Sequence, residues 1–248
     1  MGRRVLAVSA FERQYAKEFT ASQSILALAD RLFQQNEAKV VLDRTRYATL
    51  AAASLYSKAR KQMEAVSLLA SQSYVEDAMI LARSLANLCI DLGYITAEPD
   101  QIETRARRWT AKGRVERCKF GKRVGTAPPD EANVDWIKEE ALADEWPKTI
   151  EQRAKEGGLE NFYNLPYRHG SSFEHSDSWS AASFLDFKTD VVDMLTGPSE
   201  RFIDLALLTL ACCAGEIAIR FGKFYGFEFA GAADAEMKAL VKKWFPLK

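Results

Sequence analysis

The chain has only two histidines, and both lie in one short stretch, YRHGSSFEHSD (residues 167–177). They are His169 and His175, and Arg168 stands beside the first of them. An imidazole can carry a proton near neutral pH, and a guanidinium offers a planar fork of donors to phosphate oxygens. Such a pair has no nucleophile of its own, but RNA supplies one in its 2′-hydroxyl. The residue types therefore predict cleavage of RNA by proton transfer.

We expect this stretch to lie in a helix that begins with Asn164 as its N-cap. The seven-residue spacing of Arg168 and His175 is two helical turns with a residual of about 20°, so the two side chains would share a face. His169 and His175 would instead lie about 120° apart. A regular helix therefore cannot bring both histidines to one metal ion.

Other interpretations of the two histidines stay open. His175 fits a hydrogen-bonded structural histidine as well as a catalytic or ligand-binding one, and His169, next to Gly170, fits a surface position. A metal site requires a segment that is not helical, and its ligands would then be His169, Glu174, His175 and Asp177. On the helical interpretation we expect neither a metal nor a cofactor.

A line of polar residues runs along an otherwise apolar segment, residues 73–95. Arg83, Asn87 and Asp91 follow one another at four-residue spacing, so they share one face of a helix. The line is a solvated edge, an internal salt bridge, or the wall of a pocket that faces the helix of Arg168. Tyr167 and Ser171 carry hydroxyls near the helix face of Arg168. The candidate binding residues are therefore Arg83, Asn87, Tyr167 and Ser171.

The charges are unevenly distributed between residues 100 and 156. Residues 105–123 carry nine Lys or Arg against one Glu, and residues 130–146 carry seven Asp or Glu against one Lys. One interpretation is two solvated helices whose opposite charges pair. The other is a local phosphate-binding face on the basic helix, with Trp109 and Phe120 available for stacking on bases.

Apolar residues recur at helical spacing through most of the chain, and runs of period two are hard to find, so the sequence predicts an all-α fold. The core should be built by helices at 43–70, 73–95 and 199–224, with 73–95 the most buried. The other expected helices are 20–36, the basic helix at 105–123, an acidic helix that starts with 130–146 and is ended by KEGG (155–158), and 232–245.

The chain has no net charge at neutral pH. Lys and Arg number 34, and so do Asp and Glu, so any attraction to nucleic acid or membrane must be local. The four cysteines have no metal-binding or redox spacing, and Cys212 and Cys213 are expected to be buried thiols. The longest apolar stretch, residues 205–215, is shorter than the ~20 residues of a membrane span. We expect a cytoplasmic protein that does not enter a membrane.

The spacing of Arg168 and His175, after a helical N-terminal part, resembles the R-x4–6-H signature of the HEPN superfamily (higher eukaryotes and prokaryotes nucleotide-binding). LARSLANLCIDLGYI (81–95) and YRHGSSFEHSD are similar to two segments of a bacterial branch with HEPN-like helices. The resemblance covers roughly residues 43–223. The sequence departs from that branch at Asn87, where the branch has Glu. An amide cannot act as a base, so hydrogen bonding is the role that this position can keep.

The resemblance implies a helical bundle of HEPN type with additional helices. It also implies that His175 transfers protons, that Arg168 stabilises the phosphorane-like transition state, and that two copies form a homodimer. The corresponding domain boundaries are an N-terminal helical extension (1–42), a HEPN-like domain (43–230) with a charged insertion near 100–156, and a short C-terminal helix (231–248).

The activity implied by the resemblance is that of a metal-independent endoribonuclease, a toxin or phage-defence effector. Its expected partners are RNA, a second copy of the chain, and an antitoxin or defence partner. The alternative is a non-catalytic helical module that binds a nucleotide, RNA or a partner protein, and a third hypothesis is a purely structural helical protein. The neutral charge disfavours tight binding to any RNA regardless of sequence.

Overall fold

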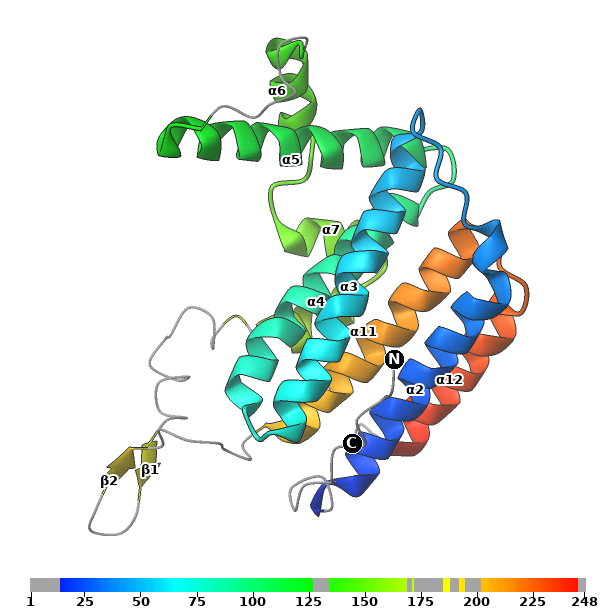
Figure 1. Ribbon diagram of the computed structural model, residues 1–248, viewed down its shortest axis with the longest axis vertical. Helices are drawn as coiled ribbons and strands as arrows, with labels where there is room; N and C mark the ends of the chain where they lie inside the picture. The colour runs from blue at the N-terminus through cyan, green and yellow to red at the C-terminus, as the bar shows by residue number, and fades with distance from the viewer. Residues whose placement is uncertain are drawn as a thin grey trace.

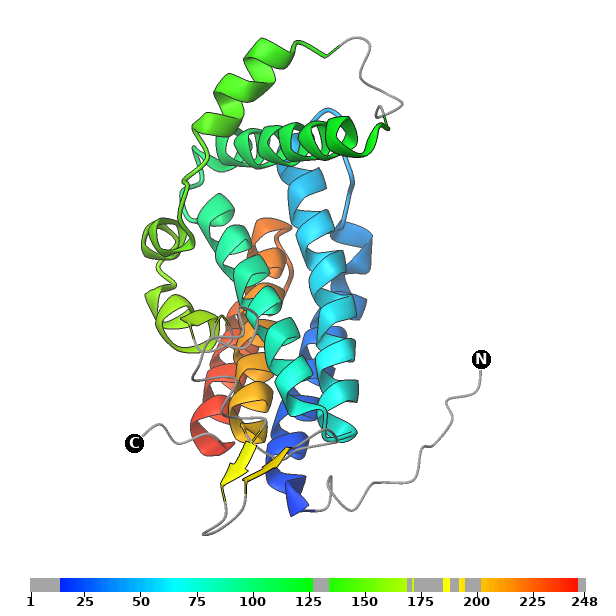
Figure 2. The same cartoon turned by 90° about the vertical axis from the view of Figure 1, so that its left-hand side faces the viewer.

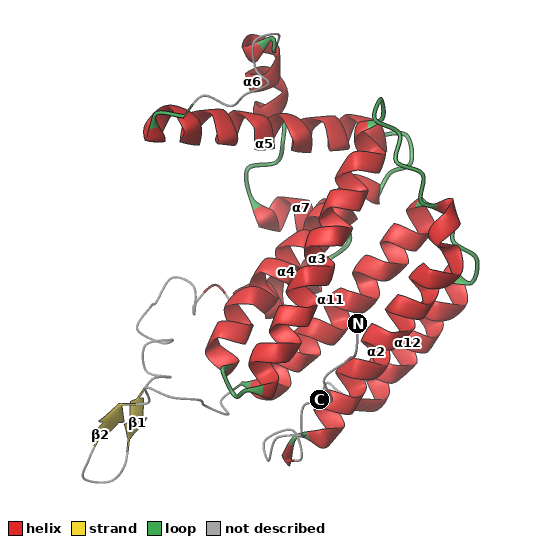
Figure 3. Ribbon diagram, viewed as in Figure 1, coloured by secondary structure: helices red, strands yellow, loops and turns green. Residues whose placement is uncertain are grey.

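The computed structural model describes residues 14–126, 134–168, 171, 185–187, 192–194 and 202–244. The long helices are α2 (Ala16–Asn36), α3 (Tyr47–Ser71), α4 (Val75–Thr96), α5 (Ile102–Val124), α11 (Ile203–Phe224) and α12 (Ala230–Trp244). The shorter elements are η1 (Glu37–Lys39), α6 (Trp136–Asp144), α7 (Ile150–Glu156), α8 (Glu160–Phe162), the π-helical turn η2 (Tyr163–Tyr167), β1 (Leu185–Phe187) and β2 (Val192–Met194). The predicted all-α fold class is confirmed (Figure 3).

The core is a bundle of long helices. Helices α3, α4 and α11 pack on one another, and α2 and α12 pack against α11 (Figure 1). The prediction that residues 43–70, 73–95 and 199–224 build the core is therefore confirmed. A second, small feature was not predicted: β1 and β2 pair antiparallel, with Leu185 opposite Met194.

Helix α2 shows how the apolar spacing determines burial. It begins at Ala16, earlier than the predicted residue 20, and two hydroxyls near its start bond to carbonyls one turn before them. The Thr20 hydroxyl donates to the Ala16 carbonyl at 2.6 Å, and that of Ser24 donates to the Thr20 carbonyl at 2.7 Å. The apolar residues at helical spacing, Ile25, Leu28, Ala29 and Leu32, are buried on one face.

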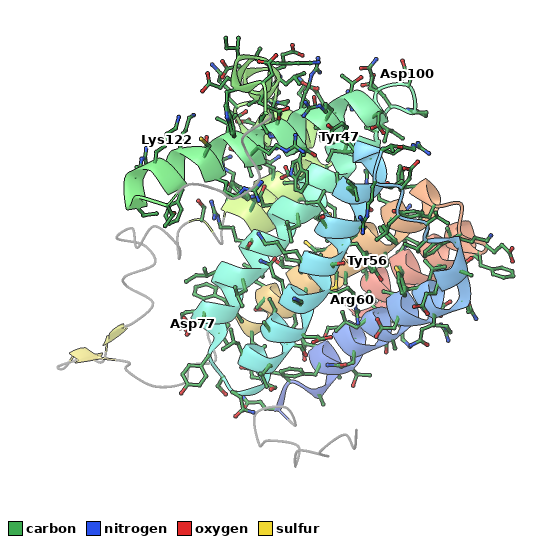
Figure 4. All side chains as sticks on the ribbon, turned by 45° about the horizontal axis from the view of Figure 1, so that its top comes forward. Tyr47, Tyr56, Arg60, Asp77, Asp100 and Lys122 are labelled. Carbon is green, nitrogen blue, oxygen red and sulfur yellow. The ribbon has the colours of Figure 1, made fainter. Side chains whose placement is uncertain are left out.

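An aromatic cluster joins three helices of the bundle. Tyr56 of α3 stacks on Phe33 of α2 at 5.3 Å and on Phe221 of α11 at 4.2 Å between ring centroids. One helical turn further along α3, Arg60 forms an ion pair of 2.6 Å with Asp30 of α2 (Figure 4 labels Tyr56 and Arg60).

The packing shows no domain boundary near residue 42 or residue 231, because α2 and α12 pack on the same core as α11. The boundaries at these residues therefore stay predictions.

Helix α5 crosses the end of the bundle, and α7 lies beside α4 (Figure 2). Helix α6 packs on α5 and forms with it an arm on this end of the molecule. The prediction of one acidic helix up to the KEGG segment is wrong. Pro147 lacks a backbone N–H and disfavours helix in the residue before it, so α6 ends at Asp144 and Thr149 caps a separate helix α7, accepting from the Gln152 N–H at 3.1 Å.

Two helices, α4 and α11, are long and apolar enough to cross a membrane by length and composition. In the bundle, however, 67% and 72% of their apolar windows are buried inside the protein. Buried core helices of other proteins are equally long and apolar. Among the described residues, these two helices are therefore only weak evidence for a membrane span.

Candidate functional site

The polar line of α4 faces other protein segments. The Arg83 guanidinium donates to the Tyr167 hydroxyl at 3.0 Å, and its Cζ lies 4.7 Å from the centre of the Tyr167 ring. Two turns further along, Asp91 accepts a hydrogen bond from Nε of Arg153 at 2.7 Å and is 9% exposed. The interpretation of this line as a solvated edge is therefore wrong. Asp91 is buried, Arg83 and Asn87 are half-buried, and Arg83 and Asp91 bind partners outside α4.

Arg168 is the described member of the predicted catalytic pair. It is exposed, and its Cζ lies 5.8 Å from the centre of the Tyr163 ring. The Tyr163 ring stacks on that of Tyr167 at 5.5 Å between centroids. Two stacked rings thus lie between two guanidiniums, in the order Arg83, Tyr167, Tyr163 and Arg168, and these contacts attach the segment of Arg168 to α4.

The local geometry differs from the predicted helix. The helical segment begins at Glu160 with α8, and the predicted cap Asn164 lies inside the π-helical turn η2. Ser171 is half-buried. His169 and His175 lie outside the described residues, and so does the metal-site hypothesis built on His169, Glu174, His175 and Asp177. In the part of the chain that the structure describes, no group of three or more His, Cys, Asp or Glu is placed to hold a metal ion.

A buried ion pair lies at the C-terminal part of the polar line. Arg153 donates to Asp91 and to the Pro147 carbonyl, the latter at 2.8 Å, and its Cζ lies 5.3 Å from the Trp146 ring centre. Burial raises the pKa of Asp91 and outweighs Arg153 and the Trp109 indole, which act to lower it. The pair anchors α7 and the turn before it to α4.

Next to this pair, α4, α5, α7 and the turn before α7 enclose a cleft of about 700 Å³. Its wall includes Asn87, whose Oδ1 is buried and accepts no hydrogen bond from the described residues. A buried acceptor without a partner costs roughly 1–3 kcal/mol, so this atom is a candidate ligand contact. The lining residues are Asn87, Asp91, Trp109, Thr110, Lys112, Gly113, Arg114, Glu116, Arg117, Trp146 and Arg153.

The cleft carries positive charge at its mouth. Lys112 and Arg117 of α5 are exposed and form no ion pair with the described residues. The carboxylates of the lining are paired, since Asp91 binds Arg153 and Glu116 binds Lys119 of α5 at 3.5 Å. The cleft therefore favours an anionic ligand.

The two interpretations of the charged helices apply to different residues. Arg107 and Arg114 of α5 pair with the buried carboxylate Glu139 of α6, and Arg108 pairs with Glu145, so the pairing hypothesis is confirmed for these cations. Trp109 lines the cleft, whereas the other predicted stacking residue, Phe120, is 65% exposed and is not part of the lining.

The predicted buried thiols differ in their exposure. Cys213 is fully buried and interacts with Cys89, and burial raises its pKa well above the ordinary value. Cys212 is half-buried rather than buried, and burial raises its pKa to about 12. Both groups stay protonated near neutral pH, so neither is a reactive thiolate.

The sequence indicated Arg83, Asn87 and Tyr167 as binding residues, and the structure brings Arg83 and Tyr167 together and places Asn87 in the cleft. The sequence did not indicate Arg153 and Trp146, because their contacts with α4 depend on tertiary packing. Residues 49–192 match the profile of a family of unknown function, DUF5677. Neither a curated protein nor a solved structure matches the chain.

Proposed function

The chain belongs to the family of unknown function DUF5677, so its role must be inferred from its own residues. We propose that it is a metal-independent endoribonuclease that uses Arg168 and His175. We place it in the cytoplasm as a toxin or phage-defence effector. The main support is the contact of Arg83 with Tyr167, which fixes the residue before Arg168 against α4. Asn87, at the cleft, follows Arg83 by about one helical turn.

The proposed reaction is an internal phosphoryl transfer. The 2′-hydroxyl attacks the adjacent phosphorus while His175 accepts its proton, and the bond from phosphorus to the 5′-oxygen breaks. The leaving oxygen takes up a proton, and the products are a 2′,3′-cyclic phosphate and a 5′-hydroxyl. Arg168 offsets the negative charge that grows on the phosphoryl oxygens in the transition state.

The resemblance to the HEPN superfamily supports the same assignment. The R-x6-H spacing of Arg168 and His175 matches that superfamily's signature, and the all-α bundle is the fold class that the resemblance implies. In this proposal the protein acts as a homodimer, and an antitoxin or defence partner keeps it inactive until it is needed.

The test is cleavage of RNA by the purified chain in EDTA. We expect a 2′,3′-cyclic phosphate product and no cleavage of a substrate whose 2′-hydroxyls are replaced by hydrogen. His175→Ala should lower the rate by on the order of 10²-fold or more, as loss of a general acid–base does. Arg168→Lys should also lower it, because an ammonium cannot reproduce the guanidinium fork.

The matched control is His169→Ala, which should leave the rate close to that of the wild type. Loss of activity in His169→Ala with full activity in His175→Ala would contradict the assignment, as would inhibition by EDTA. In cells, expression of the chain should arrest growth, and His175→Ala should relieve the arrest.

The second candidate function is binding of RNA or a nucleotide without cleavage. The observation that favours it is the cationic cleft, where Lys112 and Arg117 lie beside Trp109. This candidate predicts saturable binding of RNA by a chain that leaves the RNA intact. Cleavage that depends on His175 would exclude it.

A further inference from the structure

A glycine lies at the centre of the α5 face that lines the cleft. Trp109, Gly113 and Arg117 follow one another at four-residue spacing, so all three share this face. A Cβ added to Gly113 would meet no heavy atom within 4 Å, so no neighbouring group requires a glycine there. Glycine inside a helix is less favourable than alanine. Its effect in this helix is to leave the cleft open between an aromatic ring and a guanidinium.

We propose that this cleft holds one nucleotide unit of an RNA strand, with its phosphate at Lys112 and Arg117 and its base between Trp109 and Asn87. The inference rests on the proposed action on RNA and adds where the substrate is held. The volume of about 700 Å³ lies within the range of small-ligand sites.

The mouth of the cleft matches a phosphate. Lys112 and Arg117 are exposed cations that have no carboxylate partner among the described residues. The two cations are therefore available to phosphate oxygens, and Arg117 can donate two parallel hydrogen bonds.

The inner part of the cleft matches a base. Trp109 is half-buried and offers an aromatic surface, and bases of any sequence stack on such rings. The buried Oδ1 of Asn87 accepts hydrogen bonds and lacks a donor among the described residues. An amino group or ring N–H of a base is a donor that would satisfy it. The Asp91 carboxylate does not compete with Asn87 for the donor of the base, because it already accepts a hydrogen bond from Arg153.

The cleft is connected to the predicted catalytic segment through α4. Asn87 lies four residues after Arg83, which is about 6 Å along the helix axis, and Arg83 contacts Tyr167. In this proposal, a strand held at Asn87 lies about one helical turn along α4 from Arg83, the residue that holds the segment of Arg168. This arrangement makes the cleft a positioning subsite for the nucleotide next to the one that is cleaved.

The first experiment fills the cleft without disturbing the fold. Gly113→Leu should weaken binding of a labelled, uncleavable 2′-O-methyl RNA strand by at least about tenfold, measured by fluorescence anisotropy, because the side chain occupies the ligand's space. Its melting temperature should stay equal or rise, since leucine favours helix. Gly231→Leu is the control, because this α12 glycine also has no heavy atom within 4 Å of an added Cβ. Equal binding by Gly113→Leu and the wild type would overturn the inference.

The second experiment reverses charge at the mouth. Lys112→Glu/Arg117→Glu should weaken RNA binding by at least about tenfold and make the slope of log affinity against log salt shallower by about 0.7, the value for one phosphate contact on a single strand. Lys122→Glu/Arg123→Glu is the control, with the same charge change on the same helix outside the cleft. An equal loss in both double variants would show a diffuse charge effect and overturn the site.

The third experiment separates base from phosphate. Asn87→Ala should weaken binding of AMP by about fivefold to tenfold, because the base loses its acceptor, and should leave binding of ribose 5-phosphate unchanged. Equal effects on the two ligands would contradict a base contact at Asn87. Binding of AMP as tight as that of the strand would identify a free nucleotide as the ligand and overturn the assignment to RNA.

The failures of the two proposals are distinguishable. If binding of RNA depends on Gly113 but no RNA is cleaved, the cleavage proposal fails and the subsite stands. If cleavage depends on His175 while Gly113→Leu changes neither RNA affinity nor KM, the subsite fails and the cleavage proposal stands.

Discussion

Asp91 and Glu139 are buried carboxylates with arginine partners, yet their pKa values shift in opposite directions. At Asp91 the effect of burial is larger than that of Arg153, so its pKa is raised. At Glu139 the hydrogen bonds from Arg107 outweigh burial, and Arg114 adds to them, so its pKa is lowered. Two guanidiniums around one carboxylate therefore make the link between α5 and α6 the acid-sensitive one.

We expect the arm of α5 and α6 to loosen in acid. A lowered folded-state pKa means that ionised Glu139 contributes stability above its ordinary pKa of 4.5, and that this contribution is lost as the pH falls through the lower folded value. Hydrogen exchange of the α6 amides, followed from pH 6 to pH 3, should show protection falling below about pH 4.5.

The controls use one buried and one exposed carboxylate of α6. Glu139→Gln should remove the acid-dependent step and cost roughly 1–3 kcal/mol at neutral pH, because two arginines lose a charged partner. Glu140→Gln, at an exposed neighbour, should leave the profile unchanged. An unchanged acid step in Glu139→Gln would show that another group controls it.

At the level of single residues, the sequence predicted spacing but not partners. Arg83, Asn87 and Asp91 were found because four-residue spacing places them on one face. The partner of Asp91 lies 62 residues away, and the local sequence gives no reason to choose Arg153 among the cations of residues 105–168. The choice is made by packing, which brings α7 against α4.

The packing of α7 on α4 depends on Gly157, which directly follows α7 and lies against the backbone of α4 at Gly93. An added Cβ on Gly157 would lie 3.0 Å from the backbone N of Tyr94 and 3.2 Å from the backbone C of Gly93. Backbone atoms cannot rotate away as side chains do. The two elements therefore approach each other through glycine, and Arg220 of α11 donates to the carbonyls of both, at 3.2 Å for Gly93 and 3.0 Å for Gly157.

Gly157→Ala should therefore destabilise the protein. We expect a loss of about 1–3 kcal/mol in the free energy of unfolding, measured with urea, because the methyl group pushes α7 away from α4. The φ of Gly157 is −84°, which alanine adopts without strain, so the effect is one of packing. Gly231→Ala is the matched control, with open space around the added Cβ and no expected loss. Equal stabilities of the two variants would contradict this account.

At the level of elements, long helices were predictable and short ones were not. Apolar periodicity over more than twenty residues located α3, α4 and α11, since each buries a continuous face. Helix α7 has seven residues and α8 has three, which is too short for periodicity to appear. Their positions depend on the break at Pro147 and on tertiary contacts with α4.

The whole molecule combines a neutral chain with an uneven distribution of charge. Lys and Arg balance Asp and Glu at 34 each, but α5 concentrates cations, and its C-terminal part extends beyond the bundle (Figure 4 labels Lys122 there). The cations nearest α6 are neutralised by its carboxylates. Lys112 and Arg117 at the cleft have no carboxylate partner among the described residues, so they can attract an anion locally.

On this scale the remaining prediction is a homodimer with the segments of residues 167–177 close together. The R-x6-H resemblance implies a shared site, and two-fold dimers are the commonest soluble oligomers. Light scattering should give a mass near twice the 27.8 kDa of the chain. A monomer at every accessible concentration would remove the shared-site arrangement.

Mixing two inactive variants tests whether the site is shared. If Arg168 of one copy acts with His175 of the other, a heterodimer of Arg168→Ala and His175→Ala has one site with both wild-type residues and one with neither. Random exchange of equal amounts then restores about a quarter of the wild-type rate, because half of the dimers are mixed and each has one intact site. If each copy uses its own pair, every site lacks one residue and the mixture stays inactive. Restored activity would therefore place Arg168 and His175 of one site on different copies.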